Sequence, residues 1–193
     1  MANKVKYGLK NVYYAKATID DSTHTATYAA PVAWPGAVSL SMDAQGDTTK
    51  FRADNINYWI GETNSGYEGD LETALIPDSF KKDILGYFED ANSMLVENAE
   101  ATGNPFALLF QFEGDDKETR HVLYNCTATR PGVNGNTTEE TIEPQTETVT
   151  ITASSIYSSA YSKEVVKGTV KNGDSYYSSW FTSVHLPSAT TTT

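Results

Sequence analysis

Apolar and polar residues alternate with a period of two along most of the chain, which predicts a protein built mainly from strands. Residues 4–19 begin with apolar side chains at every second position, separated by lysines and a glycine, so they indicate a strand with one basic face. Residues 37–42 alternate in the same way, and the turn-like DAQGD precedes a further strand at 50–53. INYWI (56–60) and YEGDLETAL (67–75) are two more predicted strands, separated by the polar loop GETNSG.

The second half of the chain continues the strand pattern. NPFALLFQFE and ETRHVLYNCTATR flank the short segment GDDK, which predicts a β-hairpin with Gly114 and Asp115 at its turn. A polar loop follows at 131–140, and ETVTITAS is a strand in which valine and isoleucine alternate with hydroxyls. The pair Asn172–Gly173 predicts the turn of a final hairpin.

One segment, residues 78–90, has the period of a helix instead. Its apolar side chains fall on a single stripe, at Phe80, Ile84, Tyr87 and Phe88. Asp78 is the expected N-cap, and Gly86 costs about 1 kcal/mol relative to alanine inside such a helix. We therefore predict an antiparallel β-sandwich or barrel-like fold over residues 1–187 with one short flanking α-helix, and a disordered threonine-rich tail at 188–193.

Charge restricts the partners of this chain. Twenty-five acidic residues against fourteen lysines and arginines give a formal net charge of −11, which should repel the phosphates of nucleic acids and anionic membrane surfaces. No stretch is apolar for about 18 residues, and the first residues lack the apolar centre of a signal peptide. We therefore expect folding in the cytoplasm and no membrane partner. The single cysteine, Cys126, excludes an intrachain disulfide.

Motifs for catalysis or metal binding are scarce. Ser79 to Lys82 matches the S-x-x-K pattern of penicillin-recognising hydrolases, but its partner motifs are absent and helix capping explains the same residues. The three histidines, His24, His121 and His185, lie far apart, and we interpret His121 as a surface residue. Cys126 shares a predicted strand face with Val122 and Tyr124, which indicates a small buried apolar group. We predict no catalytic residue, no metal ligand and no cofactor.

Glu68, Asp70 and Glu72 alternate along one predicted strand and therefore share one face, about 6.6 Å apart. Adjacent members could match the separation of glycosidase carboxylates, but such pairs usually come from different strands around a cleft. Calcium could bridge them, although the loop pattern of a known calcium motif is missing. A solvated face and a functional acidic surface are the remaining interpretations.

The bulky residues Tyr58, Trp59 and Ile60 follow one another directly, so at least one side chain must point away from its own core. Exposed aromatic side chains beside a polar loop favour a subunit contact. An edge strand packed on the helix is an equally good interpretation of the same residues.

Several stretches, taken together in order and spacing, resemble the major tail (tail tube) proteins of long-tailed phages that infect Gram-positive bacteria. The resemblance covers about residues 4–187 and rests on VKYGLKNVYYA, WPGAVSLSMDAQGDTTKFRADNINYW, GYEGDLETALIPDSFKKDILGY, NPFALLFQFEGDDKETRHVLYNCTATRP, TEETIEPQTETVTITA and WFTSVHLP. No single motif among them is diagnostic.

This resemblance implies a non-enzymatic virion protein that assembles into stacked, hexameric rings around a tape-measure protein, with DNA later passing through without specific binding. The further implied partners are other copies of the chain, the tail terminator and the distal tail proteins, and assembly would occur in the host cytoplasm. Under this reading Glu68, Asp70 and Glu72 line the lumen, and residues 130–140 form a surface loop or an inter-ring arm. A cell-surface or carbohydrate-binding β-sandwich is the alternative, and a small hydrolase comes third.

Overall fold

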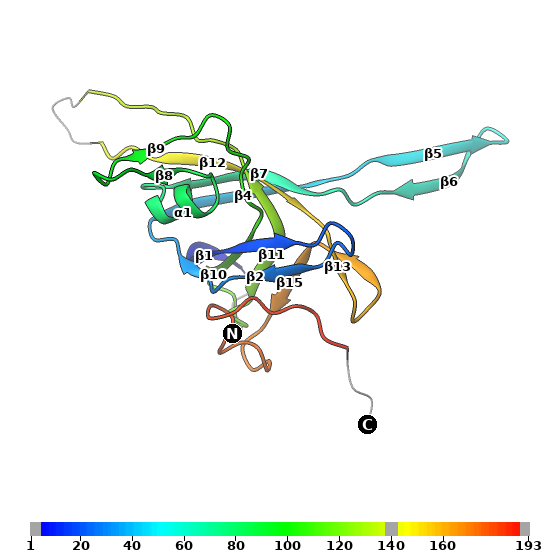
Figure 1. Cartoon of the computed structure of the whole chain (residues 1–193). Coiled ribbons are helices and arrows are strands. Elements are labelled where there is room, and N and C mark those ends of the chain that lie inside the picture. The colour runs from blue at the N-terminus through cyan, green and yellow to red at the C-terminus, as the bar shows by residue number, and fades with distance from the viewer. Residues whose placement is uncertain (1–4, 138–142, 190–193) are drawn as a thin grey trace.

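The computed structural model describes residues 5–137 and 143–189 and is dominated by one antiparallel sheet (Figure 1). This main sheet contains β1 (Tyr7–Ile19), β2 (Ala26–Tyr28), β3 (Val32–Ala33), β4 (Ala37–Gln45), β7 (Gly66–Thr73), β10 (Phe106–Glu113), β11 (Arg120–Ala128), β12 (Glu147–Ser154) and β15 (Lys167–Val170). Its order is β2-β1-β10-β11-β12-β7-β4, with β15 beside β11 and β3 beside β1. The predicted mainly antiparallel β fold with one short helix is confirmed for the described residues.

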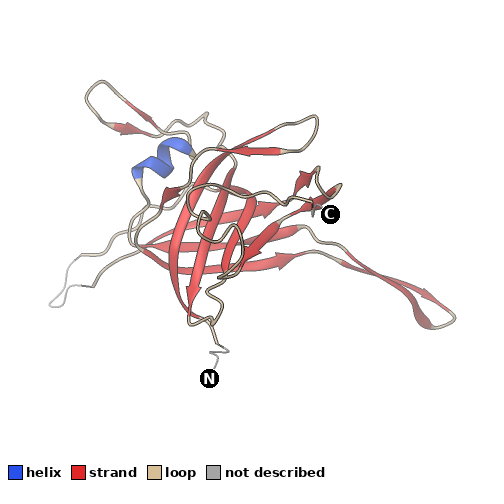
Figure 2. Ribbon diagram, turned by 90° about the horizontal axis from the view of Figure 1, so that it is seen from below, coloured by secondary structure: helices blue, strands red, loops and turns tan. Residues whose placement is uncertain are grey.

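Three two-stranded pairs stand outside this sheet. They are β5 (Thr48–Ala53) with β6 (Ile56–Glu62), β8 (Phe88–Glu89) with β9 (Leu95–Val96), and β13 (Ile156–Ser158) with β14 (Lys163–Val165). Figure 2 shows the strands of the main sheet crossing the body of the molecule, with the β5–β6 pair projecting far beyond it.

The main sheet curls until its two ends approach each other, which gives the barrel-like shape. β4 ends the strand order, yet the chain just before it forms β3, which pairs with Tyr13 and Tyr14 of β1. Between these elements the backbone N–H of Trp34 donates to the carbonyl of Val12 at 2.8 Å. The buried Trp34 side chain fills this seam and donates its indole N–H to Thr73 on β7.

Apolar side chains form two cores, one on each face of β1, β10 and β11. The first lies inside the curled sheet and centres on an aromatic cluster in which Phe80 contacts Tyr14, Trp34 and Phe106 at centroid distances of 4.3–5.3 Å. The second lies on the outer face and is covered by the C-terminal segment. Because both faces of β10 are covered, its first six residues are all buried, which explains the uninterrupted apolar run FALLF.

The predicted hairpin around Gly114 is confirmed, since β10 and β11 pair antiparallel through five registered positions. The predicted faces of two strands are partly wrong. β1 contains two register shifts, with Gly8 and Asn11 in the left-handed region at φ +62° and +52°, so Val5 and Tyr7 lie exposed. These bulges are local backbone choices that a period-two pattern does not reveal.

The face predicted for Cys126 is also wrong. β11 shifts register between its partners Leu108 and Phe106, so one extra residue turns Cys126 into the inner core while Val122 and Tyr124 face the outer core. The thiol is nevertheless completely buried, as predicted, and burial raises its pKa to about 12.

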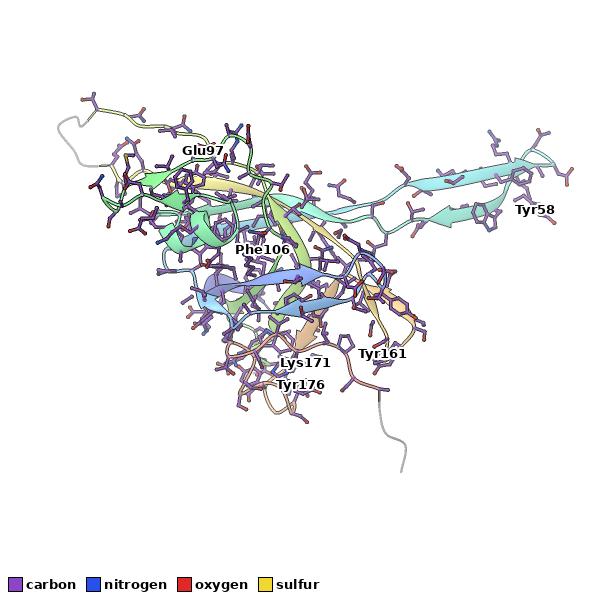
Figure 3. All side chains as sticks on the ribbon, viewed as in Figure 1. Tyr58, Glu97, Phe106, Tyr161, Lys171 and Tyr176 are labelled. Atoms are coloured by element: carbon purple, nitrogen blue, oxygen red, sulfur yellow. The ribbon has the colours of Figure 1, made fainter. Side chains whose placement is uncertain are left out.

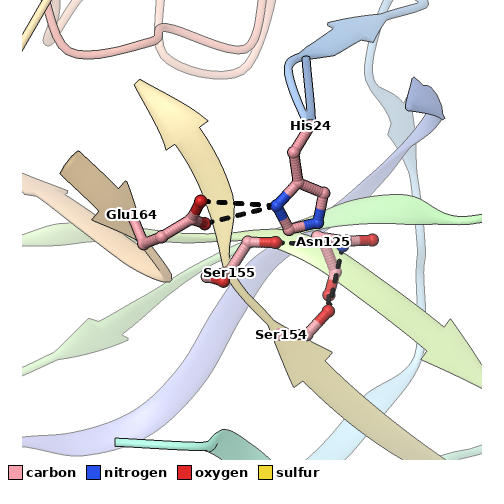
Figure 4. Close-up of polar contacts among 5 residues, drawn as sticks. All are labelled: His24, Asn125, Ser154, Ser155 and Glu164. Carbon is pink, nitrogen blue, oxygen red and sulfur yellow. Dashed lines mark hydrogen bonds and ion pairs between the residues drawn. The ribbon is translucent and has the colours of Figure 1, made fainter. Parts of the chain in front are cut away.

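β11 exchanges partners at this same shift. Residues 125–128 pair with β12, whereas residues 120–123 pair with β15. The amide of Asn125 bridges the point of exchange, donating to Ser154 Oγ at 2.9 Å and to the Ser155 carbonyl at 3.1 Å (Figure 4). The nearby His24 Nδ1 lies 3.4 Å from the Glu164 carboxylate, which ties the loop before β2 to β14.

The helix is shorter than predicted. α1 covers only Asp78–Asp83, Pro77 occupies its N-cap, and Asp78 makes no capping hydrogen bond. Gly86 ends the helical path at φ +76°, a conformation in which an added Cβ would approach Ala101 to 2.7 Å. The stripe residue Phe88 therefore belongs to β8, and only Phe80 and Ile84 of the predicted stripe are buried in the core.

The final hairpin predicted at Asn172–Gly173 does not form. Residues 171–183 run through successive turns instead, and the Asp174 carboxylate accepts the backbone N–H of Lys171 at 2.8 Å. We call residues 171–189 the strap, because they cross the outer core and bury Trp180. Ser188 belongs to the predicted disordered tail, but its backbone carbonyl accepts a hydrogen bond from the Tyr161 hydroxyl. Residues 190–193 of that tail lie outside the described chain.

None of the helical segments in the described ranges has the length and apolar character needed to cross a membrane.

Candidate assembly surfaces

The acidic residues singled out in the sequence lie on β7, between β4 and β12. Leu71 and Thr73 of this strand are fully buried, whereas Glu68 and Asp70 are exposed and Glu72 is partly so. The three carboxylates therefore occupy the face of the sheet opposite the inner core.

Hydroxyls and one further carboxylate flank this row on both neighbouring strands. On β4 the registered partners of Glu72, Asp70 and Glu68 are Ser39, Ser41 and Asp43, and on β12 they are Thr148, Thr150 and Thr152. We call these nine residues the acidic face. It carries four carboxylates and five hydroxyls, with no lysine, arginine or apolar side chain among its members.

Hydroxyl groups fix two of the carboxylates in place. Asp70 accepts from Thr150 Oγ1 at 2.7 Å, and Glu72 accepts from Thr146 Oγ1 at 2.6 Å and from Ser39 Oγ at 2.9 Å. The bonds from Thr146 and then Ser39 hold the pKa of Glu72 below its usual value. Among the described residues, no three acidic, histidine or cysteine side chains come together in a way that could bind a metal ion.

The aromatic residues singled out in the sequence lie on a projecting hairpin, residues 46–65, which we call the arm. Its strands continue β4 and β7, because Ser65 N–H donates to the Gln45 carbonyl and Thr63 N–H to the Asp47 carbonyl. One two-stranded ribbon thus runs from the acidic face out to the tip at Asp54–Asn55. Figure 1 shows this ribbon reaching away from the helix, which excludes an edge strand packed on α1.

Every large apolar side chain of the arm is exposed. Phe51, Ile56, Trp59 and Ile60 each expose more than half of their surface, and Tyr58 exposes 68%. Figure 3 shows Tyr58 on the outer part of the arm, far from the core residue Phe106. Phe51 and Trp59 are paired across the two strands, so the arm carries an aromatic pair with no covering layer from the described chain.

Sequence reasoning missed that these strands form one hairpin. The signal was the pair Asp54–Asn55, whose φ values of +50° and +61° are those of a two-residue type I′ turn. Asp and Asn tolerate the left-handed region better than other residues with a side chain. The absence of alternation in INYWI also fits a strand with no buried face.

The other candidates from the sequence do not assemble into a site. Lys82 Nζ pairs with Glu89 at 3.0 Å, and no hydrogen bond joins it to Ser79 in the described chain. His121 is half-buried, so its surface assignment is wrong: its ring stacks on Phe110 with centroids 5.1 Å apart. His185 lies in the strap, where its ring stacks on Tyr176 at 4.3 Å.

An open groove of about 660 Å³ runs between β15 and the strap. Its aromatic lining includes Tyr124, Tyr176 and Trp180. The Trp180 side chain is buried, the Tyr124 hydroxyl donates to the His185 carbonyl, and one face of the Tyr176 ring is covered by His185. These three aromatic side chains therefore mainly hold the strap in place.

Similarity to known proteins is low. No family model and no curated protein matches the chain. One similar solved chain belongs to the structure described as "Cryo-EM structure of the anti-feeding prophage (AFP) baseplate, 6-fold symmetrised", with a TM-score of 0.49 and 11% identity. The match covers 88% of this chain and 97% of the other.

Proposed function

We propose that this protein is a structural subunit of a phage virion that assembles with copies of itself into stacked rings, forming a tail tube. The arm is the observation that carries this proposal. A two-stranded hairpin is marginally stable alone in water, and this one exposes five large apolar side chains. Exposed apolar clusters of this kind mark interaction sites. The arm therefore gains its covering layer from another subunit, with Tyr58, Trp59 and Ile60 at the contact.

The acidic face supports a tube more specifically than a closed oligomer. Asp43 lies directly opposite Glu68, and like charges in such positions destabilise a sheet by up to about 1 kcal/mol. A face that retains this repulsion, and lacks any cation among its nine members, is suited to repel passing phosphates. Fixed carboxylates act over about 8 Å at physiological salt. In the proposed tube this face lines the lumen.

The same proposal assigns the remaining partners. A tape-measure protein occupies the lumen during assembly, and a tail terminator and distal tail proteins bind the two ends. DNA passes without a specific site, and the subunit needs no catalytic residue or cofactor. The chain assembles in the host cytoplasm and works in the virion. Whether residues 130–140 act as a surface loop or an inter-ring arm falls partly on 138–142, outside the described residues.

Negative-stain microscopy of concentrated protein tests this function. The wild type should form tubes or six-membered rings, and a variant with Tyr58, Trp59 and Ile60 all changed to serine should remain monomeric. Val5→Ser is the matched control, because Val5 is 63% exposed and lies outside the arm. Monomeric wild type that binds glycans would support the carbohydrate-binding alternative. Tubes formed by the arm variant would refute the role of the arm.

A second experiment tests the lumen. Virions that carry Glu68→Lys, Asp70→Lys and Glu72→Lys together should still contain tubes, because all three side chains lie on the polar face, away from the inner core. Such virions should eject DNA more slowly, since lysines would attract the phosphates. Ejection at the wild-type rate would contradict a lumenal position of the acidic face.

A further inference from the structure

The structure has a second exposed apolar surface, on the segment between α1 and β10. Residues 84–103, which we call the lobe, contain the β8–β9 pair, and the side chains of Phe88 and Met94 are 52% and 59% exposed. Because Phe88 pairs with Val96 and Asp90 N–H donates to the Met94 carbonyl, Phe88 and Met94 lie on the same face of this small hairpin.

The lobe is also strongly acidic. It contains four carboxylates and no lysine or arginine, and its acids are Glu89, Asp90, Glu97 and Glu100. Two of them are already paired with cations from outside the lobe: Glu89 with Lys82 at 3.0 Å, and Glu97 with Arg130 at 2.6 Å. In the described chain, Asp90 and Glu100 have no cation within 4.0 Å.

The arm carries two cations on β5, while its three carboxylates, Asp47, Asp54 and Glu62, lie at its base and at its tip. Lys50 and Arg52 flank Phe51 on β5, and Lys50 is registered opposite Ile60. Neither cation lies within 4.0 Å of a carboxylate of the described chain, and Arg52 donates only to the Asn55 carbonyl, at 3.4 Å. Because side chains alternate along β5, Lys50 and Arg52 share one face of the arm with Ile60, opposite the face of Phe51 and Trp59. The lobe presents apolar side chains beside two carboxylates that lack a cation in the described chain, and of these Asp90 accepts the backbone N–H groups of Asn92 and Met94.

These two surfaces lie at opposite ends of the molecule. Figure 1 places β5–β6 and β8–β9 at the two extremes of the long axis, and Figure 3 shows Tyr58 and Glu97 correspondingly far apart. One chain cannot bring them together, but neighbouring copies can. Complementary patches at opposite ends produce head-to-tail contacts, which close into rings or continue as filaments.

We propose that the arm of one copy docks on the lobe of the next, with the Ile60 face of the arm against Phe88 and Met94, and with Lys50 and Arg52, which share that face, opposite Asp90 and Glu100. This acceptor site rests on the proposed self-assembly. Methionine suits such a site because its flexible thioether adapts to the shape of a partner side chain. The charges select the orientation in which the arm approaches.

Crosslinking between two variants tests this contact, because the only natural cysteine, Cys126, is completely buried and should stay unreactive. Tyr58→Cys and Met94→Cys are prepared separately, mixed under assembly conditions and treated with a short bis-maleimide. We expect a crosslinked dimer that contains one copy of each variant. Tyr58→Cys mixed with Val5→Cys is the matched control, and it should give no dimer above background.

Adding Lys50→Glu and Arg52→Glu to the Tyr58→Cys chain should abolish the crosslink to Met94→Cys. Tubes that form without the Tyr58–Met94 crosslink, or with equal crosslinking in the Val5 control, would overturn the lobe as acceptor and leave the tube itself standing. Wild-type protein that forms no rings or tubes under any assembly condition would overturn both proposals.

Discussion

His121 should make the fold sensitive to mild acid. Its ring stacks on Phe110 and meets the edge of Phe112 at a centroid distance of 5.7 Å, and its buried Nδ1 has no hydrogen-bond partner in the described chain. This desolvation, followed by the charges of Lys167 and Lys6, lowers the pKa of His121 from 6.5 to about 4. The imidazole is therefore neutral in the folded protein at neutral pH.

The sign follows from comparing the two states. Nearby Asp115 raises the pKa of His121, but less than the other influences lower it. As the pH falls below about 6.5, His121 becomes protonated in the unfolded chain, whereas in the folded chain it stays neutral down to about pH 4. The stability that the neutral, buried ring contributes above about pH 6.5 is therefore lost between these two pH values. The difference between the two pKa values corresponds to about 3 kcal/mol. Because the ring is partly exposed, solvent screening reduces the effect to about 2 kcal/mol.

Urea unfolding of the wild type and of His121→Phe, each at about pH 7.5 and about pH 4.5, measures this effect. Phenylalanine keeps the stack on Phe110 and binds no proton, and subtracting its loss of stability removes the shared contribution of the carboxylates. The wild type should lose about 2 kcal/mol more than the variant on acidification. Equal losses in the two proteins would refute the burial argument.

Three further substitutions test the packing. Asn125→Ala should lower the free energy of unfolding by about 1–3 kcal/mol, measured by urea titration, because Ser154 and the backbone beside it lose their bridge. Gly86→Ala should lower the melting temperature and cost more than about 1 kcal/mol, since φ is +76° and the new Cβ would press on Ala101. Arg120→Lys should speed proteolysis of the strap, because lysine cannot reproduce the planar contact with two strap rings, at 3.7 and 4.7 Å, an interaction of about 1 kcal/mol. A strap equally resistant in this variant would show that the outer core alone holds it.

The fold class followed from the sequence wherever burial was one-sided or complete. The run FALLF and the alternating ETVTITAS became β10 and β12, and the turn at Gly114 formed where predicted. In these segments the side chains alone decide which face meets the core, so their order along the chain carries the information.

The failures occurred where the backbone or a distant segment decided the outcome. The bulge in β11 reversed the face of Cys126, and the left-handed Gly86 ended a helix whose apolar stripe continued. Asn172–Gly173 has the chemistry of a hairpin turn, but Trp180 finds its burial site on the outer core instead of in a strand. For the candidate surfaces, residue types predicted the acidic row, whereas the projection of β6, which carries Trp59, from the body was visible only in three dimensions.

The ribbon that joins the acidic face to the arm fixes the orientation of one relative to the other. β4 and β5 follow one another in the chain, as do β6 and β7, and only short connections at 46–47 and at 63–65 interrupt the ladder. At about 3.3 Å per residue, the 17 positions from 37 to 53 span roughly 55 Å. A slip of one residue in either strand would turn its side chains to the opposite face. A subunit contact at the tip of the arm therefore also sets the orientation of Glu68 and its neighbours, because both lie on one continuous ribbon. The geometry of the contact thus determines how a distant charged surface faces.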